Sequence, residues 1–180
     1  MQKNHNHIRT NIIKHCSIVS LLSLVFFLCC SCNIMEYDKY PVVHVIDGDT
    51  IVVIYGISRE KVRLIGIDTP EIERPDHKGE YCAQEALGFT RSIAEGQIAR
   101  IEFDTEKRDK YGRLLGYVYI MSDEKEIFLN EQLIKKGLAR TMSIPPNTLH
   151  ADRFSRLQKE AASAKIGIWG SSTCSAIVQN

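Results

Sequence analysis

The sequence predicts a mainly β protein, a small closed barrel with helices packed against its outside. Short segments with the alternating or apolar pattern of strands are interleaved along the chain with longer segments of helical spacing. The chain has 180 residues, of which 44% are apolar and 25% charged, and it contains no internal repeat. These values suit one globular domain with an additional segment.

The expected strands are short and bounded by turn residues. Five segments have the pattern of strands: 42–46, 51–55, 61–67, 98–103 and 114–121. A tight turn at residues 47–50 joins the first two strands. Pro70 cannot donate to a β-ladder, so the third strand should end just before it, with Arg63 near its start and two acids at its exit.

Three segments have helical spacing: 81–94, 127–137 and 151–165. In the first, Ala86, Phe89 and Ile93 recur at the interval of one helix face. Gly137 is expected to end the second helix. The polar segments 72–80 and 104–113 are expected to be loops.

Residues 1–32 have the organisation of an export signal. Three cations, Lys3, Arg9 and Lys14, precede an uncharged run at residues 18–30. A membrane-spanning helix needs roughly 20 apolar residues, so this shorter run suits the apolar region of a signal peptide. We expect the rest of the chain to be exported, with residues 33–39 as a polar spacer.

The end of the signal resembles a bacterial lipoprotein cleavage site, where a cysteine after small residues becomes lipidated. Cys32, which follows Ser31, is the expected lipidated residue, and Cys30 is the alternative. An ordinary cleaved signal peptide explains the same residues nearly as well. The protein would therefore be extracellular, or a lipoprotein anchored in the periplasm or at the cell surface.

Two of the six cysteines, Cys82 and Cys174, lie outside the signal segment. Exported proteins face an oxidising compartment, so these two cysteines can form one disulfide between the start of a helix and the C-terminal tail. Two unpaired thiols are the alternative.

The net charge argues against a broad basic binding face. Residues 1–32 hold three of the 23 basic residues and none of the 22 acidic ones, so the remaining chain has a net charge of −2. A protein that binds nucleic acid through a broad basic face is normally far more positive. Any phosphate partner must be bound locally.

Five charged residues lie at the ends of the expected strands and turns: Asp49, Asp68, Glu71, Arg63 and Arg113. Carboxylate oxygens are the ligands preferred by calcium and magnesium. Arginine side chains bind phosphate oxygens through two parallel hydrogen bonds. A divalent cation beside two arginines suits a phosphodiester, because both neutralise charge that develops on phosphorus. The set predicts hydrolysis, although Asp68-Thr69-Pro70 alone would also be ordinary turn chemistry.

Four sequence blocks, in this order, closely resemble the thermonuclease (staphylococcal-nuclease-like) family. The blocks are Asp47-Gly48-Asp49-Thr50, Arg63-Leu64-Ile65-Gly66-Ile67-Asp68-Thr69-Pro70-Glu71, Asp109-Lys110-Tyr111-Gly112-Arg113, and Leu129-Asn130-Glu131 with Lys136-Gly137-Leu138-Ala139. The similarity covers about residues 40–170 and leaves 171–180 as a C-terminal tail. It implies a five-stranded OB-fold barrel with three α-helices, which cuts DNA and RNA with calcium.

The resemblance also implies a role for each matching acid. Asp49 and Asp68 would bind calcium through their carboxylates, and Thr69 through its backbone carbonyl. Glu71 would position or deprotonate the attacking water. Asp47 would lie near the metal without binding it.

The basic residues would act on the phosphate. Arg63 and Arg113 would stabilise the transition state from opposite sides, and the products would carry 3′-phosphate and 5′-hydroxyl ends. Lys110 and Tyr111 match positions that contact the terminal phosphate of a nucleotide.

One departure from the family lies at residues 140–146. The family has tyrosines there that pack against the nucleotide base, whereas this chain has no aromatic residue in the segment. Base stacking on an aromatic ring is worth roughly 1–3 kcal/mol. We therefore expect weaker binding or a changed base preference.

A second function class is a non-catalytic OB-fold module that binds nucleic acid or protein at the cell surface. Such a module can dispense with Asp49, Glu71 and the second arginine, and all three are present. The sequence therefore favours an enzyme, which we expect to be a monomer acting on single-stranded or frayed nucleic acid.

Overall fold

The structure is a computed structural model and describes residues 39–122, 125–170 and 174. All of them belong to the unit Tyr37–Asn180. The expected signal at 1–32 with Cys32, the spacer up to residue 38 and the tail other than Cys174 lie outside the described residues. Within the described part, no helix is long and apolar enough to cross a membrane.

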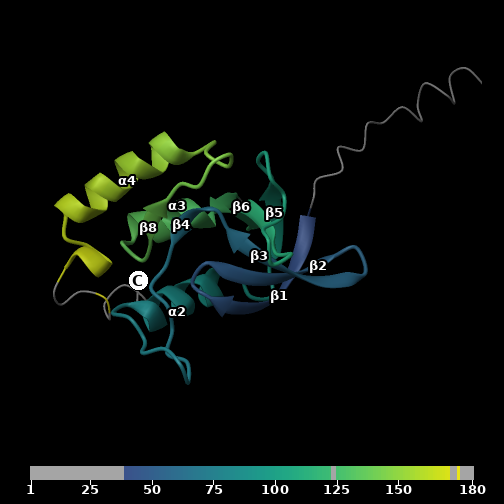
Figure 1. Ribbon diagram of the computed structural model, residues 1–180, viewed down its shortest axis with the longest axis horizontal. Helices are drawn as coiled ribbons and strands as arrows, with labels where there is room; N and C mark the ends of the chain where they lie inside the picture. The colour runs from purple at the N-terminus through teal and green to yellow at the C-terminus, as the bar shows by residue number, and fades with distance from the viewer. Residues whose placement is uncertain (1–38, 123–124, 171–173, 175–180) are drawn as a thin grey trace, which may run out of the picture. The chain divides into compact units, whose positions relative to one another are not determined.

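Eight strands occur in the described residues: β1 (Lys39–Asp47), β2 (Thr50–Tyr55), β3 (Ser58–Leu64), β4 (Gly66–Asp68), β5 (Ile98–Glu102), β6 (Leu114–Met121), β7 (Glu126–Phe128) and β8 (Arg140–Met142). Six of them form a sheet in the order β3-β2-β1-β5-β6-β7. An additional parallel pairing between β3 and β6 closes five of these strands into a barrel (Figure 1). The predicted fold class, a five-stranded OB-fold barrel with helices outside, is confirmed.

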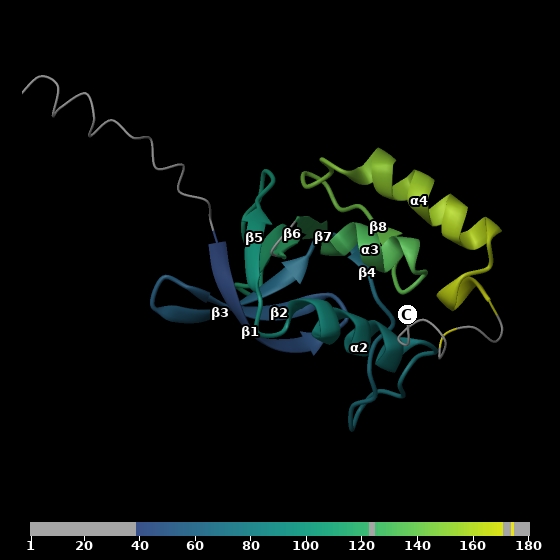
Figure 2. The same ribbon diagram turned by 180° about the vertical axis from the view of Figure 1, so that it is seen from behind.

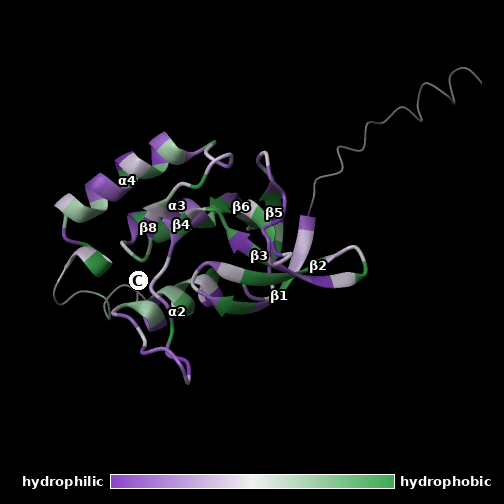
Figure 3. Cartoon of the chain, viewed as in Figure 1, coloured by the Kyte–Doolittle hydropathy of each residue, from purple (hydrophilic) through white to green (hydrophobic). Residues whose placement is uncertain are grey.

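The barrel interior is filled by aliphatic side chains. Val45, Ile51, Val53, Val62 and Leu64 have no exposed surface. Figure 3 shows that β2 and β6 are largely apolar, whereas β1 begins with a hydrophilic stretch. Full burial of one such side chain is worth about 1.5–3 kcal/mol, so this core holds the strands in register.

Three α-helices pack outside the barrel: α2 (Ala83–Ala94), α3 (Leu129–Lys135) and α4 (Ala151–Ser163). Figure 2 shows α2 beside β1, and α4 on the outer side of α3. α2 packs against β1, whereas α3 packs between β6 and α4. A short 3₁₀ helix, η1 (Gly167–Trp169), follows α4.

Helix α2 fixes the turn between β1 and β2. The Thr90 hydroxyl donates a hydrogen bond of 2.6 Å to the carbonyl of Gly48. A Cβ at Gly48 would lie 2.7 Å from Thr69 Oγ1 and 2.9 Å from Ala86 Cβ, so only glycine fits. The turn is therefore held closely against both the helix and the exit of β4.

The expected single strand at 61–67 is wrong, because the structure divides it at Ile65 into β3 and β4. Gly66 has φ +79°, and a Cβ there would lie 2.8 Å from the Phe154 ring. Asn130 stabilises the break, since its amide donates to the Ile65 carbonyl at 2.9 Å and accepts from the Val118 N–H at 2.9 Å. Arg63 consequently lies near the end of β3 and not at the start of a strand.

Other boundaries also differ. The helix expected at 127–137 begins at Leu129, because Glu126–Phe128 forms β7 on the edge of the sheet. The first and last helices are shorter than expected, beginning at Ala83 and ending at Ser163 respectively. Strand β8 was not predicted, since its three residues carry no periodic signal.

Cys82 and Cys174 are joined by a disulfide, with their Cα atoms 5.6 Å apart. Both cysteines are buried, and Cys82 immediately precedes α2. The disulfide therefore attaches residue 174 to the start of the helix that supports the β1–β2 turn.

Candidate active site

Asp49 lies in the turn between β1 and β2 and is almost fully buried. Its backbone carbonyl accepts from the N–H of Leu64 at 2.9 Å, and its Oδ2 accepts from the N–H of Thr69 at 2.9 Å. One residue thus joins the turn to the end of β3 and to the exit of β4. The blocks that contain Asp49, Arg63 and Asp68 are brought to one place.

Arg63 points from β3 into this junction. Its Nη1 lies 3.0 Å from Asp49 Oδ2, and its Nη2 lies 2.8 Å from Asp68 Oδ1. Nη1 also donates to the carbonyls of Leu64 at 2.8 Å and Ile67 at 3.0 Å. The two expected metal-binding carboxylates therefore share one guanidinium group, which fixes the side chain of Arg63.

Burial raises the pKa of Asp49 above its ordinary value, and the positive charge of Arg63 only partly opposes this. A buried carboxylate that remains short of positive charge is stabilised by an additional cation. Asp68 is more exposed, with 44% of its side chain accessible. The pair therefore presents one buried and one accessible carboxylate.

These donors fit a calcium ion. The set would be the carboxylates of Asp49 and Asp68 with the Thr69 backbone carbonyl, all of them oxygens that hard cations prefer. In the part of the chain that the structure describes, no group of three or more His, Cys, Asp or Glu side chains has the arrangement of a metal site. A site with only two carboxylates would need water or substrate oxygens to complete its coordination.

Glu71 follows β4 and has half of its side chain exposed. Its backbone N–H donates to the Glu80 carboxylate at 3.1 Å, and its carboxylate pairs with Arg74 at 3.4 Å. Burial and the neighbouring carboxylate of Asp47 raise the pKa of Glu71. A carboxylate with raised pKa is a better proton acceptor than an ordinary one.

Arg113 lies immediately before β6, whose parallel pairing with β3 aligns Leu115 with Arg63. Its Nε donates to Asp109 at 2.7 Å, and the other oxygen of Asp109 accepts from the N–H of Arg113 at 2.9 Å. Burial opposes ionisation of Asp109, but these hydrogen bonds lower its pKa. Arg113 is thus oriented by an ionised acid of its own turn.

The two arginines line one cleft of about 480 Å³. Lys110 and the largely exposed Tyr111 line it from the turn before β6. Met142, Ile144 and Pro145 also line it, so the segment without aromatic residues belongs to this cleft. The cleft therefore combines two guanidinium groups, one ammonium group and an apolar wall, the features that suit a nucleotide.

The cleft does not include every expected residue. Asp49, Asp68, Thr69 and Glu71 do not line it in the described part of the chain. Asp49 and Asp68 contact Arg63 directly, and Thr69 contacts Asp49. Asp49 and Asp68 therefore adjoin the cleft through Arg63, whereas Glu71 pairs with Arg74.

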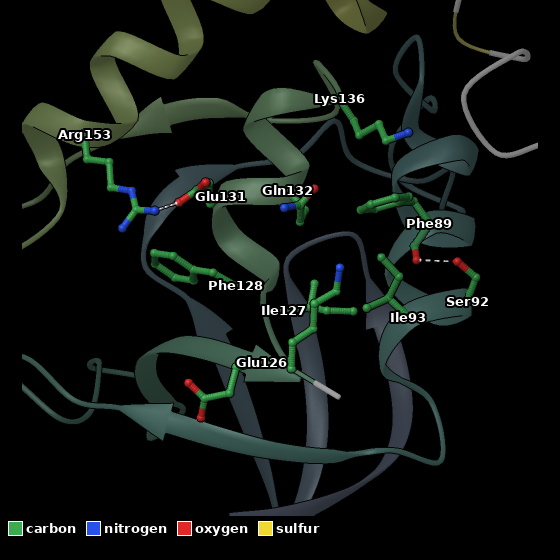
Figure 4. A pocket seen from close by; sticks show the side chains of 11 residues that line it. Phe89, Ser92, Ile93, Glu126, Ile127, Phe128, Glu131, Gln132, Lys136 and Arg153 are labelled. Atoms are coloured by element: carbon green, nitrogen blue, oxygen red, sulfur yellow. Dashed lines mark hydrogen bonds and ion pairs between the residues drawn. The ribbon is translucent and has the colours of Figure 1, made fainter. Parts of the chain in front are cut away.

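A larger cavity of about 600 Å³ lies between α2, β7, α3 and α4 (Figure 4). Phe89, Ile93 and Ile127 give it apolar walls, and Glu131 inside it pairs with Arg153. None of the residues expected to act in the site lines this cavity. Despite its size, this cavity is separate from the residues that the sequence predicts to be catalytic or to bind metal or substrate.

The sequence assigned no role to Arg74, Glu80 or Asp109. Asp109 belongs to a recognised block, and its four-residue spacing from Arg113 is a usable signal for an ion pair. Arg74 and Glu80 lie in a segment whose only sequence signal is polarity. Their contacts with Glu71 become visible only when the loop is folded.

Comparison with known proteins gives consistent results. The family model described as "Staphylococcal nuclease homologue" matches residues 61–171. The chain is 40% identical over 132 residues to the thermonuclease of Staphylococcus hyicus and 41% identical over 132 residues to that of Staphylococcus intermedius. Each match covers 73% of this chain and 76% of the relative. Endonuclease YncB of Bacillus subtilis is 40% identical over 129 residues, which cover 71% of this chain and 59% of YncB.

Proposed function

Because this chain belongs to the staphylococcal nuclease family, we propose that it is a calcium-dependent nuclease that hydrolyses phosphodiester bonds in DNA and RNA. The relatives named thermonuclease and endonuclease support the nuclease activity. The observation that carries the proposal is the shared position of Arg63 and Arg113 in one cleft, with two carboxylates bound to Arg63.

Arg63 and Arg113 would bind the phosphate oxygens and neutralise the charge that develops there in the transition state. The two arginines approach from different elements, β3 and the turn before β6, so they can hold one phosphate between them. Lys110 and Tyr111 would contact a neighbouring phosphate at the mouth of the cleft. Local binding of this kind is compatible with the net negative charge of residues 33–180.

Asp49, Asp68 and the carbonyl of Thr69 would hold the calcium ion, which supplies positive charge next to the phosphate when it is bound. Asp47 is buried beside them and pairs with Arg74, so it would act without direct contact with the ion.

Glu71 would accept a proton from the attacking water, whose oxygen then bonds to phosphorus. The bond from phosphorus to the 5′-oxygen breaks, and this oxygen takes up a proton. The products would then be a 3′-phosphate and a 5′-hydroxyl, as the family resemblance implies.

The test is cleavage of labelled single-stranded DNA and RNA by the purified protein, with calcium and with a chelator, alongside Glu71→Ala and Arg63→Ala. We expect cleavage only with calcium, and a fall of orders of magnitude in both variants. Products that accept a labelled phosphate from a polynucleotide kinase without prior phosphatase treatment carry 5′-hydroxyl ends. Binding without cleavage under all conditions would instead indicate a non-catalytic binding module.

We further propose that the protein is exported and monomeric, either free or anchored through a lipid at Cys32. The signal pattern of residues 1–32 supports export. Labelling of growing cells with a radioactive fatty acid should mark the protein, and Cys32→Ala should abolish the label. An unlabelled protein in the culture medium would favour free secretion.

A further inference from the structure

The loop between β4 and α2 is closed by its own hydrogen bonds and projects below α2 in Figure 1. The N–H of Glu80 donates to the carbonyl of Glu71 at 3.0 Å, and the Glu80 carboxylate accepts from the N–H of Glu71 at 3.1 Å. Arg74 and His77 exchange two backbone hydrogen bonds of 2.9 and 3.1 Å. The backbone positions of Glu71 and Arg74 are therefore fixed relative to each other.

The Arg74 side chain extends from this loop to two acids. Its Nη2 lies 2.9 Å from Asp47 Oδ2 and 3.4 Å from Glu71 Oε2. This nitrogen carries two N–H groups, which suffice for one bond to each carboxylate. Among the residues that the structure describes, Arg74 is the only cation paired with either acid.

The two acids differ in their freedom to move. Asp47 is buried with 4% of its surface exposed, and its other oxygen accepts from the N–H of Gly48 at 2.8 Å. Glu71 is half exposed, and its carboxylate interacts with Arg74 and with Asp47. Arg74 therefore connects an exposed carboxylate to a buried one and partly offsets the repulsion between them.

We propose that Arg74 is a positioning residue, which holds the carboxylate of Glu71 beside Asp47 in the place where it accepts a proton from water. This inference rests on the proposed nuclease function, because Glu71 acts on water only if the chain hydrolyses nucleic acid. Arg74 does not contact the cleft that holds the phosphate. Its loss should therefore affect turnover and leave substrate binding nearly unchanged.

The experiment compares kcat and KM for cleavage of a single-stranded DNA oligonucleotide by the purified protein, Arg74→Ala, Arg74→Lys and Arg91→Ala in calcium. Arg91 is a matched control, because it is 49% exposed against 50% for Arg74 and also pairs with a glutamate, Glu95 at 3.1 Å. Arg74→Ala should lower kcat about tenfold, which is less than the loss expected when the general base itself is removed. Its KM should stay within about twofold of the parent's KM. Arg74→Lys should restore most of kcat, because lysine retains the charge. Arg91→Ala should behave as the parent.

Thermal melting of all four proteins separates positioning from folding. An unchanged or increased kcat in Arg74→Ala would overturn the inference, as would a fall that Arg74→Lys does not reverse or that Arg91→Ala shares. A loss of kcat that follows a large drop in Tm would also overturn it. An inactive parent would refute the proposed function itself, whereas an active parent with an equally active Arg74→Ala would refute only the role of Arg74.

Discussion

Asp49 and Arg63 form a buried ion pair, with 3.0 Å between Oδ2 and Nη1 and only 6% and 12% of their side chains exposed. The pair joins the β1–β2 turn to β3, and through Asp68 it extends to β4. Two residues expected to bind different partners, a metal and a phosphate, are thus each other's partner. A change at either residue should consequently alter both stability and activity.

Arg63→Ala is expected to abolish most activity and to destabilise the fold by about 3 kcal/mol, because it leaves a buried carboxylate without its cation. Initial cleavage rates and urea unfolding measure the two effects. Arg59→Ala is the matched control, since Arg59 lies on the same strand, is exposed and has no ion pair among the described residues. If Arg63→Ala and Arg59→Ala are equally stable, the ion pair does not support the fold.

Asp49→Asn should increase stability at neutral pH in a chelator, although it removes a metal ligand and activity. Burial raises the pKa of Asp49 above 3.8, so the folded protein binds this proton more tightly than the unfolded chain. Stability is therefore lost as pH rises from 3.8 through the raised pKa, and the loss persists above it. Asparagine does not ionise, so the variant avoids this loss of folding stability. The loss amounts to about 1.4 kcal/mol for each unit by which folding raises the pKa of Asp49. Arg63 keeps Asp68, Leu64 and Ile67 as partners.

Urea unfolding between pH 4 and pH 8 tests this expectation, and the advantage of Asp49→Asn should shrink toward the acidic end. Asp152→Asn, a change at an exposed acid of α4, serves as the control. A variant that is less stable than the parent at pH 7, or a difference independent of pH, would contradict the linkage argument.

Ile144→Tyr should strengthen binding of single-stranded DNA by about 1 kcal/mol, or roughly fivefold, because a ring can then stack on a base in the cleft. Ile144 lines the cleft and is 60% exposed, which leaves room for the ring. Leu149→Tyr is the control, since Leu149 is 58% exposed but does not line the cleft. Fluorescence anisotropy in calcium, with Glu71→Ala in all proteins to prevent cleavage, gives the affinities. Equal affinities for both tyrosine variants would show that position does not matter.

Replacement of Cys82 and Cys174 together by serine should lower the free energy of unfolding by about 3 kcal/mol, because the disulfide closes a long loop in the unfolded chain. The two cysteines are 92 residues apart in sequence. Urea unfolding of the parent with a reductant should coincide with that of the double variant. A parent that is insensitive to reductant and as stable as the double variant would exclude a stabilising disulfide.

Local sequence patterns predicted most of the fold. The strand at 114–121 has the expected bounds, because its apolar residues are bounded by a polar turn on each side. The break after Leu64 was missed, because an apolar run does not reveal that Gly66 must leave room for Phe154. That contact joins residues far apart in sequence. The last two residues of β7, Ile127 and Phe128, were expected in a helix for a related reason, since they extend the apolar pattern of α3.

The candidate site was predicted as a set of residue types and only partly as an arrangement. The sequence indicated Asp49 and Asp68 as metal ligands and Arg63 as a phosphate ligand. It did not indicate that these residues pair with one another. The contacts of Arg74 with Asp47 and Glu71 depend on the path of a polar loop, which no periodicity specifies.

The parallel pairing of β3 with β6 has a consequence for how activity is acquired during folding. It joins segments about fifty residues apart, Val62 with Leu114 and Arg63 with Leu115, and such non-local pairings form slowly because a long loop must close first. The two arginines line one cleft only when this pairing is complete. In a refolding experiment, recovery of cleavage should therefore lag behind recovery of the helical circular dichroism signal, so that enzyme activity reports the last step of assembly.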